Sequence, residues 1–374
     1  MRFTVDRATM LKALAHVQSV VEKRNTIPIL ANLMLAVRDG RLTLTATDME
    51  IAVVEDVAAS TSRDGATTAP AVTLYEIVRR LPEGAEIELD HPGGDAPLKL
   101  RAGRYVTSLM VLPTEDFPAM TAGTLPHHFA LPASALRTLI DRTRFAISME
   151  ETRYYLNGIY LHATESDGVP VLRAVATDGH RLARVEEPLP EGASGMPGVI
   201  VPRKTVLELR KLIEETNEAV EIALSDTRIQ FRVGPVTLTS KLIDGTFPEY
   251  ERVIPRDNDK VLRVAKRDFS DAVARVAAIS SERSRPVKLS LSRDLLVLSA
   301  ISPEQGSASE ELDAERMKYE AGPLEIGFQA RYLNDITDQI DGDVEFRFAD
   351  GTAPTVVQDA ADASTLYVLM PIRV

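Results

Sequence analysis

A threefold internal repeat constrains the fold of this chain more than any other feature. One pattern of apolar residues, a short alternation followed by helical spacing, begins at Phe3, at Phe129 and at Leu262. The copies begin 126 and 133 residues apart, which is far longer than a solenoid repeat and close to the size of a whole domain. The sequence therefore predicts three tandem, similar domains, bounded at residues 1–125, 126–257 and 258–374.

Later parts of the sequence repeat in the same order. Thr47-Asp48 corresponds to Thr177-Asp178, and Phe117-Pro118 corresponds to Phe247-Pro248. A second stretch with helical spacing occurs at residues 74–81, 205–212 and 332–340. Strands of alternating apolar and polar residues follow each of these stretches. This order predicts an α+β class, with helices on one face of antiparallel sheets.

Composition excludes several classes of protein. No run of 18 apolar residues is present, so we expect neither a transmembrane helix nor a membrane partner. The chain begins with a strand pattern and shows no signal-peptide pattern. It has no cysteine, which excludes disulfides and thiolate metal sites and is typical of a reducing compartment. We therefore expect a cytoplasmic protein without a cofactor or a metal.

The distribution of charge indicates more than the formal net charge of −12. The first helix of each repeat and its trailing loop, at residues 7–24, 133–153 and 263–285, hold 14 basic and 7 acidic residues. The rest of the chain holds 29 basic and 48 acidic residues. One such helix could be an ordinary solvated surface, but three copies favour a shared electropositive surface that binds phosphates without reading sequence.

One cluster could carry catalysis, at Thr177-Asp178-Gly179-His180-Arg181. An aspartate and a histidine two residues apart could act as acid and base or bind a metal, as in a hydrolase. Asp-Gly is also a signal for a tight turn between strands. The corresponding Thr47-Asp48 lacks both the histidine and the arginine, which favours the turn.

Several longer segments then match a known family. They include Thr26–Asn32, Leu81–Gly84, Arg153–Gly158, Ala176–Leu182, Val201–Lys204, Ser240–Gly245 and Tyr367–Arg373. Through these segments, which are spread along the whole sequence, the chain resembles the bacterial DNA polymerase III beta subunits, the sliding clamps. The resemblance implies the DNA clamp fold: a ring-shaped, head-to-tail homodimer with helices on the inner face, antiparallel sheets outside, and duplex DNA passing through the ring without sequence preference.

The resemblance also implies partners and a role without catalysis. The chain would be a processivity factor that tethers the polymerase III alpha subunit, the clamp-loader delta subunit, and other polymerases and repair proteins through short clamp-binding peptides. Two alternatives remain: a peptide-binding adaptor that never encircles DNA, and a hydrolase that uses Asp178 and His180.

Site residues follow from the resemblance position by position. DNA-binding residues would be Arg24, Arg79, Arg80, Arg153, Tyr154, Arg203 and Lys204, of which Arg79 and Arg80 rest on charge and repeat position only. The peptide-binding pocket would comprise Tyr155, Leu156, Thr177, Gly179, His180, Arg181, Leu182, Pro248, Val253, Val368, Met370, Pro371 and Ile372. The dimer interface would include Leu109, Ala278 and Ile279.

Four positions depart from residues found in relatives. Met149 and Glu150 occupy a loop in which some relatives carry His and Gln, and Glu150 would repel phosphate. Ser284 and Pro354 fall where relatives carry Phe and Ser, so the preferred peptide could differ.

Overall fold

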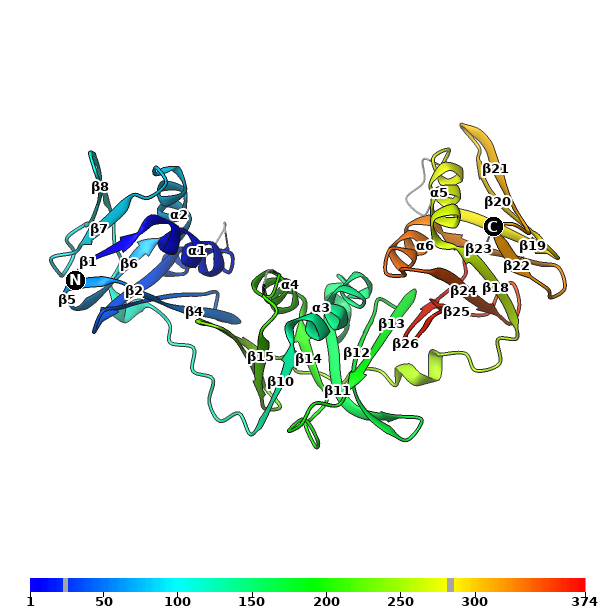
Figure 1. Cartoon of the computed structure of the whole chain (residues 1–374), viewed down its shortest axis with the longest axis horizontal. Helices are drawn as coiled ribbons and strands as arrows, with labels where there is room; N and C mark the ends of the chain where they lie inside the picture. Colours follow the sequence, from blue (N-terminus) through cyan, green and yellow to red (C-terminus); the bar gives the residue numbers. More distant parts are fainter. Residues whose placement is uncertain (23–25, 215, 281–285, 374) are drawn as a thin grey trace. The chain divides into compact units, whose positions relative to one another are not determined.

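A computed structural model describes residues 1–22, 26–214, 216–280 and 286–373. It contains two compact units, each built of antiparallel strands with short helices against them (Figure 1). Unit 1 comprises Met1–Ser134, Pro190–Pro197 and Lys204–Leu242, and unit 2 comprises Ala135–Leu189, Gly198–Arg203 and Ile243–Val374. The α+β class expected from the sequence is confirmed. None of the described helices is long and apolar enough to cross a membrane.

Unit 1 contains two antiparallel sheets. The first has the order β5 (Ser60–Arg63), β1 (Arg2–Asp6), β7 (Glu86–Asp90), β8 (Leu98–Ala102) and β9 (Tyr105–Leu109). The second has the order β10 (His127–Pro132), β15 (Ala219–Leu224), β16 (Arg228–Val233), β17 (Val236–Lys241), β4 (Ile51–Ala58), β3 (Arg41–Thr47), β2 (Asn32–Arg38) and β6 (Gly65–Pro70). Helices α1 (Arg7–Gln18) and α2 (Ala71–Arg80) lie against each other and contact strands of these sheets.

The start of α1 shows how local sequence fixes an element. The Asp6 carboxylate caps the helix by accepting a 2.9 Å hydrogen bond from the Thr9 amide. The spacing of Met10, Leu14 and Val17 then buries one face of the helix completely. The polar face stays outside that core, as the helical spacing predicts.

Unit 2 also contains two antiparallel sheets. The larger has the order β14 (Val199–Pro202), β11 (Gly158–Ser166), β12 (Val169–Thr177), β13 (Arg181–Pro188), β26 (Asp362–Leu369), β25 (Thr355–Asp359), β24 (Asp343–Phe348), β18 (Lys260–Ala265) and β22 (Met317–Tyr319). The smaller has the order β21 (Gly306–Asp313), β20 (Leu295–Ser302), β19 (Pro286–Ser292) and β23 (Leu324–Gln329). Helices α5 (Lys266–Ala277) and α6 (Ala330–Thr337) pack together, as α1 and α2 do. Two further α-helices of the described residues are α3 (Ala133–Asp141) and α4 (Arg203–Leu212).

Equivalent strands of the predicted repeats pair in the same way in the two units. In unit 1, β4 follows the Thr47-Asp48 turn and pairs with β17, the last strand of the second repeat. In unit 2, β13 follows the Thr177-Asp178 turn and pairs with β26, the last strand of the third repeat. Each turn-following strand therefore joins the final strand of the next repeat into one continuous sheet.

Candidate peptide pocket and nucleic-acid interface

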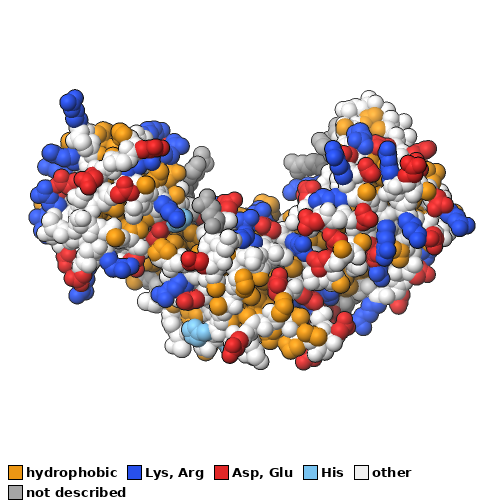
Figure 2. Space-filling model, in the orientation of Figure 1, with side chains coloured by type: hydrophobic (Ala, Val, Ile, Leu, Met, Phe, Trp, Pro, Cys, Tyr) orange, Lys and Arg blue, Asp and Glu red, His pale blue; other side chains and the backbone are white. Residues whose placement is uncertain are grey.

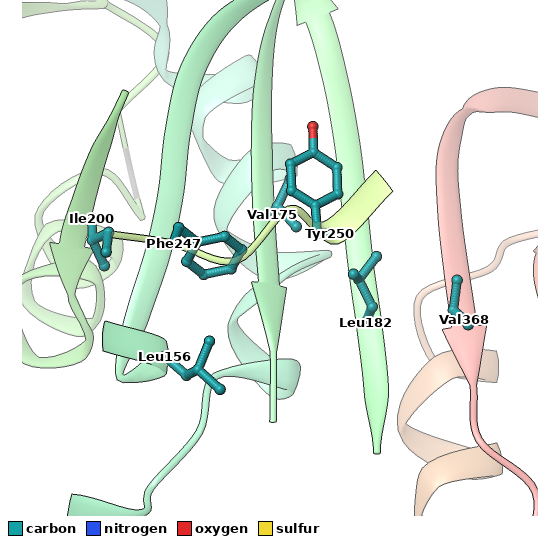
Figure 3. Close-up of a cluster of buried hydrophobic side chains, with 7 residues drawn as sticks. All are labelled: Leu156, Val175, Leu182, Ile200, Phe247, Tyr250 and Val368. Atoms are coloured by element: carbon teal, nitrogen blue, oxygen red, sulfur yellow. The ribbon is translucent and has the colours of Figure 1, made fainter. Parts of the chain in front are cut away.

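A buried apolar cluster forms the floor of the predicted pocket. Its members are Leu156, Val175, Leu182, Ile200, Phe247, Tyr250 and Val368. Figure 3 shows Phe247 and Tyr250 on a segment that crosses the strands carrying Val175 and Leu182. The cluster brings together three of the predicted pocket residues, Leu156, Leu182 and Val368, which come from the second and third repeats.

The rim of the pocket keeps apolar surface open to solvent. Val253, at the end of the short helix η5 (Tyr250–Val253), is 52% exposed, and Met370, directly after β26, is 39% exposed. Pro248 is also exposed. The Met370 amide donates to the His180 carbonyl oxygen at 2.9 Å, which holds the chain end beside the turn of residues 177–181. Exposed apolar residues above a buried apolar floor are typical of a site for a partner's side chains.

The segment Thr177–Arg181 is the tight turn favoured by the sequence. The Asp178 carboxylate accepts from the amides of His180 and Arg181 at 2.9 and 3.0 Å, and Gly179 adopts a positive φ of 87°. The first repeat builds the same turn, because Asp48 accepts from the Ile51 amide at 2.8 Å. Asp178 is therefore committed to the backbone, as expected of a structural turn rather than an acid–base pair.

Arg181 is buried and stabilises the turn beside the predicted pocket. Its guanidinium pairs with Asp335 of α6 and donates to the Phe145 carbonyl oxygen at 2.6 Å. Its central carbon also lies 4.4 Å from the ring centroid of Tyr332, a cation–π contact. These contacts stabilise the turn, whereas the neighbouring His180 is exposed.

A second groove lies along the same segment. It has a volume of about 800 Å³, its apolar walls include Tyr160, Phe247 and Ile254, and it shares only Pro248 with the predicted pocket. Buried Arg173 fixes the segment by donating to the Tyr250 hydroxyl and to Glu251, both at 2.7 Å. Desolvation, followed by the positive charge of Arg173, lowers the pKa of His162 to about 4.

The predicted DNA-binding arginine Arg153 is already engaged by a carboxylate. Its Nε and Nη2 donate to the two oxygens of Glu150 at 2.8 and 2.7 Å, and Nη2 also donates to the Asp178 carbonyl oxygen. A side chain at Gly179 would collide with Nη1, since a Cβ built there lies 2.5 Å away. The hydrogen bond from Arg153 lowers the pKa of Glu150, so this pair is ionised at neutral pH.

Lys204 is likewise engaged within unit 1. Its ammonium contacts the Val20 carbonyl oxygen at 3.2 Å, Glu22 at 3.1 Å and the buried carboxylate of Asp48. Desolvation lowers the pKa of Lys204, but the two carboxylates outweigh it and raise the pKa above its ordinary value. Lys204 therefore ties the end of α1 and the Asp48 turn to α4.

The remaining predicted DNA-binding residues differ in whether a carboxylate already pairs with them. Arg79 and Arg80 share Glu76, at 2.9 and 2.7 Å. Arg203 has no ion-pair partner among the residues that the structure describes, and the Tyr154 side chain is exposed. Arg24 and the departing position Ser284 lie outside the described residues. Figure 2 agrees with local pairing, because basic and acidic side chains are interspersed over the face that it shows.

The predicted dimer residues lie near two strands that pair on one side only in the described part of the chain, β9 and β21. Leu109 of β9 is only 7% exposed, because it faces the interior of its own sheet. The exposed apolar residues of this edge are Tyr105, Val106 and Met110. Ala278 and Ile279 follow α5, and Ile279 approaches the start of β21 at Gly306.

Sequence reasoning missed several site residues. Phe247 and Tyr250 complete the pocket floor, and the repeated Phe-Pro motif was the signal that could have revealed Phe247. Ile301, 75% exposed beside the β20–β21 turn, was a further apolar residue near an edge. Arg173 gave no local signal, because its partners Tyr250 and Glu251 are remote in the chain.

Comparison with protein families matches the three repeats in order. The N-terminal, central and C-terminal domain models of the DNA polymerase III beta subunit match residues 1–121, 130–249 and 251–373. The beta sliding clamp of Caulobacter vibrioides is 52% identical, and that of Escherichia coli K12 is 39% identical, each over the full length of both chains.

Solved structures agree with these relatives. A crystal structure of the C. crescentus beta sliding clamp is 51% identical, with a TM-score of 0.97, covering 100% of this chain and 99% of that one. A Bartonella birtlesii sliding clamp bound to griselimycin is 48% identical, with a TM-score of 0.96 and full coverage of both chains.

Three tandem α+β domains that continue one another's sheets define a sliding clamp of the DNA replication machinery. The chain belongs to the DNA polymerase III beta subunit family, whose members are non-catalytic processivity factors. This result excludes the hydrolase alternative, in agreement with the structural role of Asp178.

Proposed function

We propose that two copies of this chain close head to tail around duplex DNA and hold polymerases on it through the pocket formed by Leu156, Leu182, Val368 and Met370. The proposal rests on how the repeats are joined. In each repeat junction, the strand after the Thr-Asp turn pairs with the last strand of the next repeat. The third repeat has such a strand, β21, and the first has such a last strand, β9. Each lies at the edge of its sheet within the described residues.

The missing partner of each edge is the other edge on a second copy. Because β21 and β9 belong to opposite ends of the chain, their pairing is head to tail, and a head-to-tail contact that closes generates a ring. Exposed Val106 and Ile301 would become buried at this interface, as expected for apolar side chains at a permanent contact. The domain bounds 1–125, 126–257 and 258–374 assign one edge strand to the first domain and one to the last.

The partners of the pocket are short peptides with bulky apolar side chains. Its apolar floor and the flexible thioether of Met370 suit several related sequences. We infer that the polymerase III alpha subunit, the clamp-loader delta subunit and repair polymerases dock here, in the cytoplasm. A peptide with one glutamine and two bulky apolar residues should bind in the micromolar range, at about −8 kcal/mol.

Light scattering together with peptide calorimetry tests this proposal. The full chain should have the mass of a dimer and bind one such peptide per protomer. A strictly monomeric chain that still binds the peptide would support the adaptor alternative, which meets no DNA. A dimer that binds no peptide would refute the pocket assignment.

A further inference from the structure

The cations assigned to DNA are balanced by carboxylates of the same chain. Among the predicted DNA-binding residues, Arg79, Arg80, Arg153 and Lys204 contact four carboxylates, those of Glu22, Asp48, Glu76 and Glu150. The formal charge of these groups sums to zero. The predicted DNA-binding surface is therefore locally compensated at these positions.

The geometry at Arg153 shows what the compensation does. Glu150 occupies the Nε and Nη2 edge of the guanidinium, which is the edge that a phosphate would take in a bidentate contact. Gly179 faces Nη1. A phosphate that takes this edge of the guanidinium must displace Glu150 or share it.

Glu76 acts in the same way on α2. It lies three and four residues before Arg79 and Arg80, so one carboxylate meets both guanidinium groups from the same helix face. Glu22 meets Lys204 from an exposed position, whereas Asp48 is buried and also accepts from the amides of Glu50 and Ile51. Glu22, Glu76 and Glu150 can therefore be replaced without loss of a backbone contact, whereas Asp48 stabilises a turn of the fold.

We propose that Glu22, Glu76 and Glu150 limit the grip of the clamp on DNA by pairing with the cations that would otherwise bind phosphates. The inference rests on the proposed encirclement of DNA. A cation already paired with a carboxylate releases fewer counterions from DNA when a phosphate approaches, so binding becomes weaker and less sensitive to salt. Weak contacts that break readily suit a ring that is retained by topology and must slide.

A comparison of two triple variants tests this inference. The first carries Glu22→Gln, Glu76→Gln and Glu150→Gln. The matched control carries Glu165→Gln, Glu191→Gln and Asp226→Asn, three exposed carboxylates without an ion-pair partner among the described residues. Both raise the net charge by the same amount, and both should keep the dimer mass and the peptide affinity.

Binding to linear duplexes of two unrelated sequences is measured by fluorescence anisotropy over a range of salt concentrations. The first variant should bind more tightly than the wild type on both sequences, with a salt slope steeper by about two to three units, roughly 0.9 per freed cation. The control should keep the wild-type slope. Equal slopes in all three proteins, or equal steepening in both variants, would overturn the inference.

Retention of the wild type on nicked circular DNA separates this inference from the proposed function. If the wild type is retained and the slopes do not differ, only the role of the three glutamates fails. If the wild type is not retained, encirclement fails, while the linear-duplex comparison still decides whether the glutamates balance the cations.

Discussion

Leu182 and Val368 lie directly opposite each other across β13 and β26, and both side chains are buried. The pair joins the second and third repeats at the floor of the pocket. The predicted pocket therefore lies where these two repeats meet within unit 2. The same pattern of strand pairing makes β9 and β21 the proposed edges for a second copy.

Met370→Glu should weaken peptide binding strongly. The change places a charge where the exposed thioether meets the apolar ligand, and the loss of one anchor of this kind is worth about 2 kcal/mol or more, roughly thirtyfold in affinity. Isothermal titration calorimetry with the glutamine-containing peptide measures the effect. Val169→Glu, an equally drastic change at another exposed apolar residue, should leave the affinity unaltered. Equal affinities in both variants would place the partner site elsewhere.

Lys204→Met and Arg203→Ala should affect different properties. Loss of the Lys204 ammonium leaves the buried Asp48 carboxylate without its cation, so the free energy of unfolding should fall by about 1–3 kcal/mol. Arg203→Ala should leave stability within about 0.5 kcal/mol and weaken DNA binding equally on unrelated sequences. Urea unfolding and anisotropy measure the two effects. Unchanged stability in Lys204→Met would contradict the anchoring role of the lysine.

His162 should make the protein less stable in mild acid. Its pKa is about 4 in the folded state and 6.5 as the ordinary value, so the unfolded chain binds more protons between these values. The free energy of unfolding should therefore fall as the pH drops from 6.5 to 4, by about 2 kcal/mol after allowance for solvent screening. Urea unfolding at pH 7 and pH 4.5 measures the fall.

His162→Gln should remove that part of the pH dependence, whereas His128→Gln, at an exposed histidine, should retain it. The same fall in all three proteins would show that other groups cause it.

Val106→Cys combined with Ser309→Cys should form disulfides between copies. Superposing β21 on β4 through the strands that precede them, with Ser307 in the place of Ala52, puts Ser309 of one copy opposite Val106 of another. The native chain has no cysteine, so no other disulfide can form. Non-reducing electrophoresis should show crosslinked dimer for the double variant and monomer for each single variant. Crosslinking of a single variant would indicate a head-to-head contact instead.

The sequence alone allowed much of the fold to be predicted. Recurring apolar positions such as Met10 and Phe269 are buried at the same place in their repeats, because helical and strand periodicity depends on local spacing. The Thr-Asp turns were also predictable, since an aspartate that accepts from its own backbone needs no distant partner. Which strands lie at edges was not predictable, because pairing joins residues far apart in the chain.

The candidate site was predictable in its apolar part and less so in its charges. Leu156, Leu182 and Val368 converge as the family resemblance implies. The neutralisation of Lys204 was hidden, because Glu22 and Asp48 approach it only in the folded state. Counting charges along the sequence treats each basic side chain as unpaired. In the structure, several of these side chains form ion pairs with carboxylates.

Retention on circular DNA tests the central claim most directly. The Val106→Cys and Ser309→Cys dimer is placed on a nicked plasmid by the clamp loader, oxidised, and passed through a sizing column in high salt. We predict that the closed ring elutes with the plasmid and is lost after linearisation by a restriction enzyme. Release of the oxidised dimer from the intact circle, or equal retention on circular and linear DNA, would contradict encirclement.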